Sequence, residues 1–178
     1  MPATTELMTV EEFRRLPETG PFYYELRHGE LVQVTRPKLK HTLIQSRLLD
    51  GLKQHTGSAF WASIEVPFRP LPEHELRTAD VAVVAASRIE HTDSDDFLQG
   101  APELVVEVLS PSNTVEEISD KERLCLENGC REFWVVDPKL RQVKVATPDG
   151  VTRTYKDHQE VPLTLLGAAP LPVAAIFD

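Results

Sequence analysis

The sequence predicts an α/β (α+β) domain, in which helices flank a mixed central sheet and hairpins are added near both termini. Residues 104–109 form a short apolar, β-branched run, which is typical of a strand covered on both faces. Residues 114–128 carry apolar side chains at helical spacing, and residues 132–136 are again apolar. A strand, a helix and a strand in this order predict a right-handed crossover with two parallel strands.

Two further helices are predicted nearer the N-terminus. Residues 8–16 contain Thr9 with Glu12 three positions later, the pattern of a helix that begins with a capping box, and residues 17–21 are expected to end it. Residues 41–55 carry leucine and isoleucine at helical spacing and are followed by Gly57.

The other segments predict strands, hairpins and a packed tail. Extended runs separated by turn residues predict two single strands, at 59–68 and 80–84, and two hairpins, at 22–34 and 142–155. Residues 87–100 are polar and acidic, which predicts a surface loop or a short helix. The tail from Val161 is rich in Pro, Leu and Ala, and we expect it to pack across the domain.

Length and charge limit the classes of function. A chain of 178 residues is expected to form one domain, residues 1–178. The net charge of −9 argues against a general polyanion-binding protein, whose surface would be basic. A small basic strip remains at Arg36, Lys38 and Lys40, and it is either a phosphate-binding strip or a solvated loop. No apolar run approaches the roughly 20 residues that span a bilayer, and no secretory signal pattern begins the chain, so a cytoplasmic protein is expected.

Two acidic residues and one lysine stand out against this background. Glu107 lies in the middle of the apolar strand, where a buried carboxylate costs several kcal/mol unless a cation or hydrogen bonds compensate it. Asp80 opens the strand at 80–84 and is therefore expected at its mouth. Lys121 lies on the helix that follows the Glu107 strand, at the edge of its apolar stripe.

These residue types suit phosphodiester hydrolysis. Asp80 and Glu107 offer the oxygen ligands that Mg²⁺ prefers, and the backbone carbonyl of Leu109 could add another. A bound metal ion polarises a phosphoryl oxygen and lowers the pKa of its water, while the Lys121 ammonium could orient that water or stabilise the phosphate charge. A structural interpretation is also open, with Asp80 as a strand-end cap and Glu107 paired with Lys121 in a catalytically silent ion pair.

A resemblance to a known family adds to these observations. The order of helices and strands is similar to the core of the PD-(D/E)XK nuclease superfamily, and the chain resembles the Uma-type restriction endonuclease family within it. The resemblance spans nearly the full length and includes the specific sequence Glu-Val-Leu-Ser-Pro-Ser from position 107. The matching positions are residues 24–32, His41, residues 79–84, residues 102–112, Lys121 and residues 129–138.

The resemblance implies a restriction endonuclease-like fold with a nuclease core at about residues 39–137. It implies a DNA endonuclease that uses Mg²⁺ or Mn²⁺ and pairs as a homodimer. Asp80 and Glu107 would be the motif acids, and Lys121 would replace the lysine that Leu109 displaces. Glu25 and His41 would border the site. The chain departs from the family pattern where Ala79, Glu117 and Cys125 replace a proline, an aspartate and a tyrosine.

Overall fold

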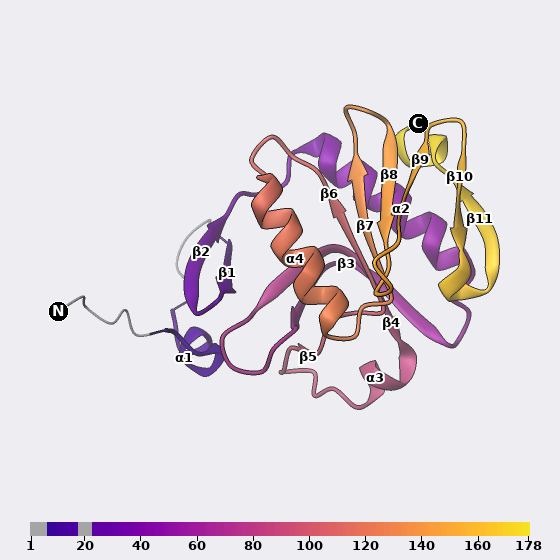
Figure 1. Cartoon of the computed structure of the whole chain (residues 1–178). Helices are drawn as coiled ribbons and strands as arrows, with labels where there is room; N and C mark the ends of the chain where they lie inside the picture. The colour runs from indigo at the N-terminus through magenta and orange to yellow at the C-terminus, as the bar shows by residue number, and fades with distance from the viewer. Residues whose placement is uncertain (1–6, 18–22) are drawn as a thin grey trace.

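A seven-stranded sheet runs through the middle of the molecule (Figure 1), in the order β5-β3-β4-β6-β7-β8-β9. The β6–β7 and β3–β5 pairs are parallel and the other pairs are antiparallel, so the predicted mixed sheet is confirmed. The computed structural model describes residues 7–17 and 23–178. The elements are α1 (Val10–Arg14), β1 (Tyr23–Arg27), β2 (Glu30–Val34), α2 (Leu39–Thr56), β3 (Phe60–Arg69), β4 (Arg77–Ala85), α3 (Ala86–Glu90), β5 (Leu98–Gln99), β6 (Leu104–Val108), α4 (Val115–Glu127), β7 (Glu132–Asp137), β8 (Gln142–Ala146), β9 (Thr152–Lys156), β10 (Glu160–Leu163), η1 (Thr164–Leu166), β11 (Ala168–Pro172) and α5 (Ala174–Phe177).

The predicted crossover is formed by β6, α4 and β7. The two strands pair in parallel from Leu104↔Glu132 to Val108↔Val136. Helix α4 begins with a capping box, in which the Thr114 hydroxyl accepts from the backbone of Glu117. Capping satisfies the free N–H groups of the first turn, so α4 has a fixed start close to the end of β6.

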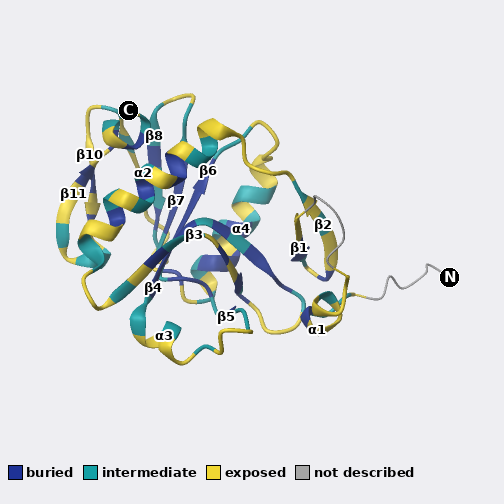
Figure 2. Ribbon diagram, turned by 180° about the vertical axis from the view of Figure 1, so that it is seen from behind, coloured by how far each residue is buried: buried dark blue, intermediate teal, exposed yellow. Residues whose placement is uncertain are grey.

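Helices α2 and α4 cover opposite faces of the sheet, as Figures 1 and 2 show from the two sides. On the α2 face, buried leucine and isoleucine side chains of the helix pack against alternate valines of β4 and β6. On the α4 face, Cys125 and Cys130 pack against the other alternate set, which includes Val105 and Phe133. Burial on both faces explains why the central strands are almost wholly apolar.

The C-terminal tail completes the core on the α2 face. Strands β10 and β11 form a two-stranded antiparallel sheet, and α5 follows them. The tail buries five apolar side chains in the same cluster as α2: Val161, Leu163, Leu171, Val173 and Ile176. The expectation that this tail packs across the domain is confirmed.

Both predicted hairpins form. Strands β1 and β2 make a separate two-stranded sheet, which joins the rest of the fold through a bridge between Leu26 and Leu76. The predicted start of this hairpin at Phe22, and residues 18–21 at the predicted end of the first helix, lie outside the described residues. Strands β8 and β9 form the second hairpin and extend the central sheet beyond β7.

The β3–β4 pair contains an irregularity at Glu65 and Asp80. Pairing runs to Ile64↔Val81 and resumes at Val66↔Ala79, skipping Glu65 and the opposite Asp80. Glu65 has a φ of 51°, in the left-handed region that side chains with a Cβ rarely adopt. The side-chain alternation of β3 reverses there, because Ile64 and earlier even-numbered residues face the α2 core whereas Val66 faces the α4 core.

The observed start of β4 corrects one expectation from the sequence. Asp80 was expected to open a strand at its mouth, but β4 begins at Arg77, and Asp80 lies within the strand. The strand begins earlier because Arg77 and Thr78 already pair with Phe68 and Pro67 of β3. The buried Arg77 side chain has its Nε 2.7 Å from Glu75 Oε2 and its Nη2 3.0 Å from Asp120 Oδ2. Asp80 reaches the site because the ladder is interrupted at its position.

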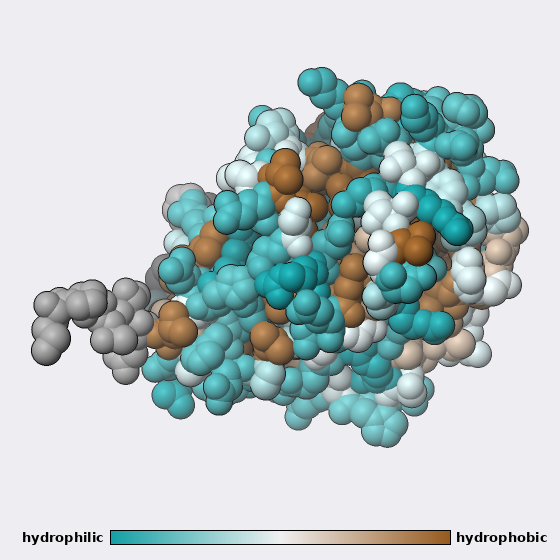
Figure 3. All heavy atoms as spheres, in the orientation of Figure 1, coloured by the Kyte–Doolittle hydropathy of each residue, from teal (hydrophilic) through white to brown (hydrophobic). Residues whose placement is uncertain are grey.

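One face of the molecule can be examined for apolar areas. The face in Figure 3 is mostly hydrophilic, with small separate hydrophobic patches. Within residues 7–17 and 23–178, none of the helices has the length and apolar character needed to cross a membrane.

Candidate active site

A cavity of about 500 Å³ lies where the β1–β2 hairpin, the start of α2, the β3–β4 irregularity and the end of β6 meet. Its lining includes every residue to which the sequence assigned a site role: Glu25, His41, Asp80, Glu107, Leu109 and Lys121. These residues come from five segments of the chain, so the fold brings together groups that lie up to about one hundred positions apart.

Glu107 and Lys121 form the innermost part of the site. Glu107 lies on β6 and Lys121 on α4, and each residue is only 7% exposed. The Lys121 Nζ lies 2.8 Å from Glu107 Oε1 and donates a hydrogen bond of 2.6 Å to the carbonyl of Thr78. The ion pair that the structural interpretation expects is therefore present. The other residues of the cavity bear on whether this pair also belongs to a catalytic arrangement.

Burial dominates the electrostatics of this pair. The pKa of Glu107 is raised to about 8, mainly by burial and to a smaller extent by the carboxylates of Asp80 and Glu25, against the lowering effect of the Lys121 charge. Burial alone would lower the pKa of Lys121, but Glu107 and Glu25 raise it above its usual value. Lys121 is thus held as a cation, while Glu107 keeps a proton more readily than an exposed glutamate.

Asp80 is held by both its oxygens. Its Oδ2 accepts a 2.7 Å hydrogen bond from the backbone N–H of Val108, which ties β4 to the end of β6. Its Oδ1 lies 3.1 Å from His41 Nε2, at the start of α2. Burial would lower the pKa of His41, but the hydrogen bond to Asp80 and the nearby carboxylates raise it overall.

Gln45 and Glu65 belong to the same group, and sequence reasoning missed both. The Gln45 side-chain amide donates to Glu65 Oε1, and its Nε2 lies 3.3 Å from both the carbonyl and the Oδ1 of Asp80. Burial raises the pKa of Glu65, and the charge of Asp80 adds to this effect. The signals available in the sequence were the Gln45 amide beside the apolar stripe of α2 and the single Glu65 carboxylate within the apolar strand β3.

Glu25 brings the N-terminal hairpin into the site. Its Oε1 accepts a 2.8 Å hydrogen bond from the N–H of Thr78 and lies 4.0 Å from Lys121 Nζ. Its Oε2 lies 2.9 Å from Arg27 Nε. Burial would raise the pKa of Glu25, but Lys121 and Arg27 lower it overall.

The residues present suit a divalent cation of the hard, oxygen-preferring kind. Four carboxylates line the cavity from different strands: Glu25, Glu65, Asp80 and Glu107. The described residues contain no group of three acidic, histidine or cysteine side chains already gathered around one metal position. Burial is the main cause of the raised pKa of Glu107, and the carboxylates of Asp80 and Glu25 add to it, so a divalent ion beside these acids would stabilise their charged forms. Oxygen donors of this type favour Mg²⁺ or Mn²⁺.

A family model described as "Uma2: Putative restriction endonuclease" matches residues 10–174. The chain belongs to the Uma2 family. The resemblance predicted from the sequence is therefore confirmed, and so is the fold that it implied. A similar solved structure is described as a "putative nuclease belonging to DUF820 from Anabaena variabilis ATCC 29413". It shares 25% sequence identity, with a TM-score of 0.81 over 96% of this chain and 97% of that chain. No curated protein matches.

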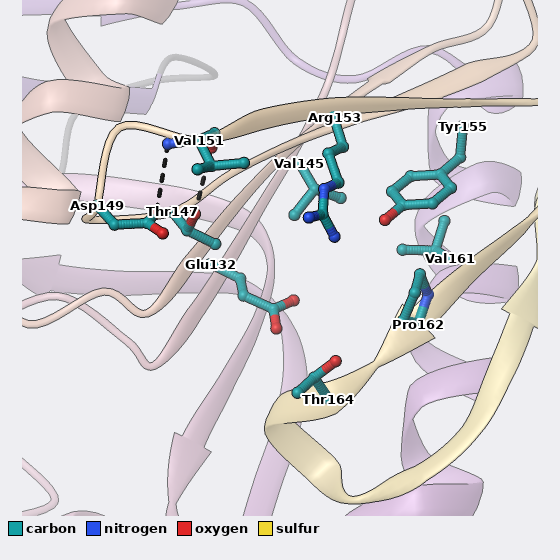
Figure 4. Close-up of a pocket in the computed structure, with 10 residues that line it drawn as sticks. All are labelled: Glu132, Val145, Thr147, Asp149, Val151, Arg153, Tyr155, Val161, Pro162 and Thr164. Atoms are coloured by element: carbon teal, nitrogen blue, oxygen red, sulfur yellow. Dashed lines mark hydrogen bonds between the residues drawn. The ribbon is translucent and has the colours of Figure 1, made fainter.

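A second cavity of this Uma2 chain, of about 190 Å³, lies between the β8–β9 hairpin and β10 (Figure 4). Asp149 Oδ1 accepts from the N–H of Val151, and the Thr147 hydroxyl donates to the carbonyl of Val151, so these groups serve the turn. Glu132 accepts a 2.9 Å hydrogen bond from Trp134 Nε1. The second cavity is also lined by only two carboxylates of the described chain, Glu132 and Asp149, so it offers less for metal-dependent catalysis than the first.

Proposed function

We propose that this Uma2 chain is a metal-dependent endodeoxyribonuclease, which hydrolyses phosphodiester bonds of DNA with Mg²⁺ or Mn²⁺ as its cofactor. The observation that carries the proposal is the meeting of Asp80, Glu107 and Lys121 at one cavity that further carboxylates also line. Membership of a family described as restriction endonucleases, and the likeness to a solved protein described as a nuclease, support it.

In this proposal the carboxylates of Asp80 and Glu107 hold the cation, with the carbonyl of Leu109 as a further donor. A divalent ion bound there would supply Lewis-acid activation of water and neutralise phosphate charge. The buried ammonium of Lys121 stays protonated and lies next to Glu107, so it can stabilise negative charge developing on the phosphate. His41 and Gln45 hold Asp80 in place from α2.

The direct test is cleavage of supercoiled plasmid and linear DNA with Mg²⁺ or Mn²⁺. Glu107→Gln and Asp80→Asn should abolish cleavage, because each removes a charged metal ligand while preserving shape. Glu116→Gln, on the exposed side of α4, is the matched control and should cleave like the wild type. A wild type that cleaves no DNA with any divalent metal would overturn the proposal.

A second candidate function is a catalytically silent binding or assembly module on the same fold. The overall charge of −9 and the pre-existing ion pair of Glu107 with Lys121 favour it. Calorimetry with Mn²⁺ separates the two candidates. Heat of binding that disappears in Asp80→Asn supports the enzyme, whereas a wild type without metal binding supports the module.

We further propose that the protein acts as a homodimer in the cytoplasm. Cutting both strands of a duplex requires two sites, and homodimers with twofold symmetry are the commonest oligomers. The hairpins at residues 22–34 and 142–155 are the candidate interface segments. Sedimentation analysis of the full chain tests the dimer, and a monomer at micromolar concentration would contradict it.

A further inference from the structure

We infer that the cavity accepts one unpaired nucleic-acid strand, either a single-stranded segment or an opened end, in preference to intact duplex. The inference rests on the proposed function and specifies its substrate. It is carried by three features of the cavity: walls that meet across it, reactive groups at its base and an exposed basic strip along its rim.

The two walls of the cavity touch. Thr35, in the segment between β2 and α2, has its Oγ1 3.4 Å from the Oγ of Ser112, in the loop between β6 and α4. Ser112 is in turn 2.8 Å from the Oγ of Ser110, which is bonded to Asn113 Oδ1 at 2.9 Å. Thr35 and Ser112 both line the cavity, so the contact between them joins two of its sides and limits the width available to a whole duplex.

The reactive groups of the same cavity are buried. Glu107 and Lys121 are only 7% exposed, so a phosphate must enter the cavity to reach them. A cavity of about 500 Å³ is the size that holds a small-molecule ligand, roughly 300–1,000 Å³, and therefore takes a nucleotide unit rather than a duplex segment. Moving a nucleotide out of a duplex stack costs a few kcal/mol, whereas an unpaired strand avoids this cost.

A basic strip leads into the cavity. Lys38 and Lys40 line it from the start of α2; both residues are exposed, and their ammonium groups form no ion pair within the part of the chain that the structure describes. Beside them the Arg36 guanidinium lies over the ring of Tyr23, 5.1 Å from its centre, and Tyr23 is 59% exposed. Cations along a groove next to an exposed aromatic ring are the features that hold a single strand, by phosphate contact and by base stacking.

The strip also stands out against the charge of the whole protein. With a net charge of −9, the molecule repels nucleic acid in general, so binding depends on the few cations that line this cavity. A strand lying along Lys38 and Lys40 would bring its phosphates towards Asp80 and Glu107. The same two lysines therefore provide a sharp test, because each phosphate contact contributes a known salt dependence.

The test measures binding in EDTA, by fluorescence anisotropy, over a series of salt concentrations. The probes are labelled oligodeoxythymidylate and oligouridylate and a duplex of the same length, about 15 nucleotides, within the range of single-strand site sizes. We expect oligodeoxythymidylate to bind at least tenfold more tightly than the duplex. In Lys38→Ala/Lys40→Ala the slope of log K against log salt should fall by about 1.4, since a single-strand contact contributes roughly 0.7.

The matched control is Lys53→Ala/Lys139→Ala, which removes two exposed lysines that do not line the cavity and should leave the slope unchanged. Lys53 lies near the far end of α2, roughly 20 Å along the helix from Lys40. Oligouridylate that binds as well as oligodeoxythymidylate would support recognition of any single strand, and weaker binding would support DNA.

Duplex binding that equals or exceeds single-strand binding would overturn the inference, and so would an absence of binding or an unchanged slope in the Lys38 and Lys40 variant. These failures are distinct from failure of the proposed function. A protein that cleaves intact duplex and prefers to bind it keeps the function and loses this inference. A protein that binds single strands but cleaves no DNA with any metal keeps this inference and loses the proposed function.

Discussion

Replacing Lys121 by methionine should reveal how the site balances its buried charge. The substitution keeps the length and apolar stem of the side chain but removes the cation 2.8 Å from Glu107 and the hydrogen bond to Thr78. Breaking a buried ion pair by removing one partner typically costs about 3–5 kcal/mol, because the remaining charge is left uncompensated.

The cost should depend on pH, because Glu107 can escape its burial by taking a proton. Its pKa in the folded protein, about 8, lies above the ordinary value of 4.5, so this group lowers the stability of the wild type as pH rises from about 4.5 to 8. Removing Lys121 raises that pKa further. At pH 9 we expect Lys121→Met to lose about 3–5 kcal/mol of unfolding free energy, and at pH 6 only about 2 kcal/mol.

Urea unfolding of a double-mutant cycle provides the measurement. Lys121→Met/Glu107→Gln removes both charges, so at pH 9 it should be at least about 2 kcal/mol more stable than the sum of the single changes predicts. Lys53→Met, at an exposed position on α2, should change stability by less than about 0.5 kcal/mol. A Lys121→Met cost below 1 kcal/mol at both pH values, or strict additivity in the cycle, would refute the reasoning.

Three other predictions follow from the site. Mn²⁺ affinity should rise with pH up to about 8 and then level off, because the metal must displace the proton that Glu107 holds. Calorimetry in two buffers should detect the released proton, and Glu107→Gln should lose this pH dependence. Thr114→Ala should lower the unfolding free energy by about 1 kcal/mol through loss of the α4 cap, whereas Thr114→Ser should retain most of the cap's stabilisation. Equal urea midpoints for the two variants would contradict the role of the cap. Glu65→Gly should be about 1 kcal/mol more stable than Glu65→Ala, because glycine adopts a φ of 51° without strain. Equal stability of the two variants would rule out backbone strain at this position. Both variants should bind Mn²⁺ more weakly if this carboxylate helps to hold the ion.

Much of the site was accessible from the sequence because its main signals are local. A single carboxylate within the run at residues 104–109 identified Glu107, and helical spacing placed Lys121 on the next element, so their proximity followed from one crossover. The positions of Glu25 and His41 came from the family resemblance. Gln45 and Glu65 carried only weak signals, and their importance is evident from their contacts with Asp80, 35 and 15 positions away in the chain.

The sequence by itself determined most of the segments that became strands and helices, because periodicity, capping boxes and turn residues act over a few positions. The short strand β5 and the tail elements β10, β11 and α5 were not predicted. It also predicted the mixed sheet, since a strand–helix–strand crossover joins parallel strands and a hairpin joins antiparallel ones. Only the tertiary structure decided where the acidic groups converge. The reversal of side-chain direction at Glu65 and Asp80, and the contact between Thr35 and Ser112 across the cavity, depend on pairing between distant segments. Those contacts form only when the whole sheet is assembled, so no local pattern encodes them.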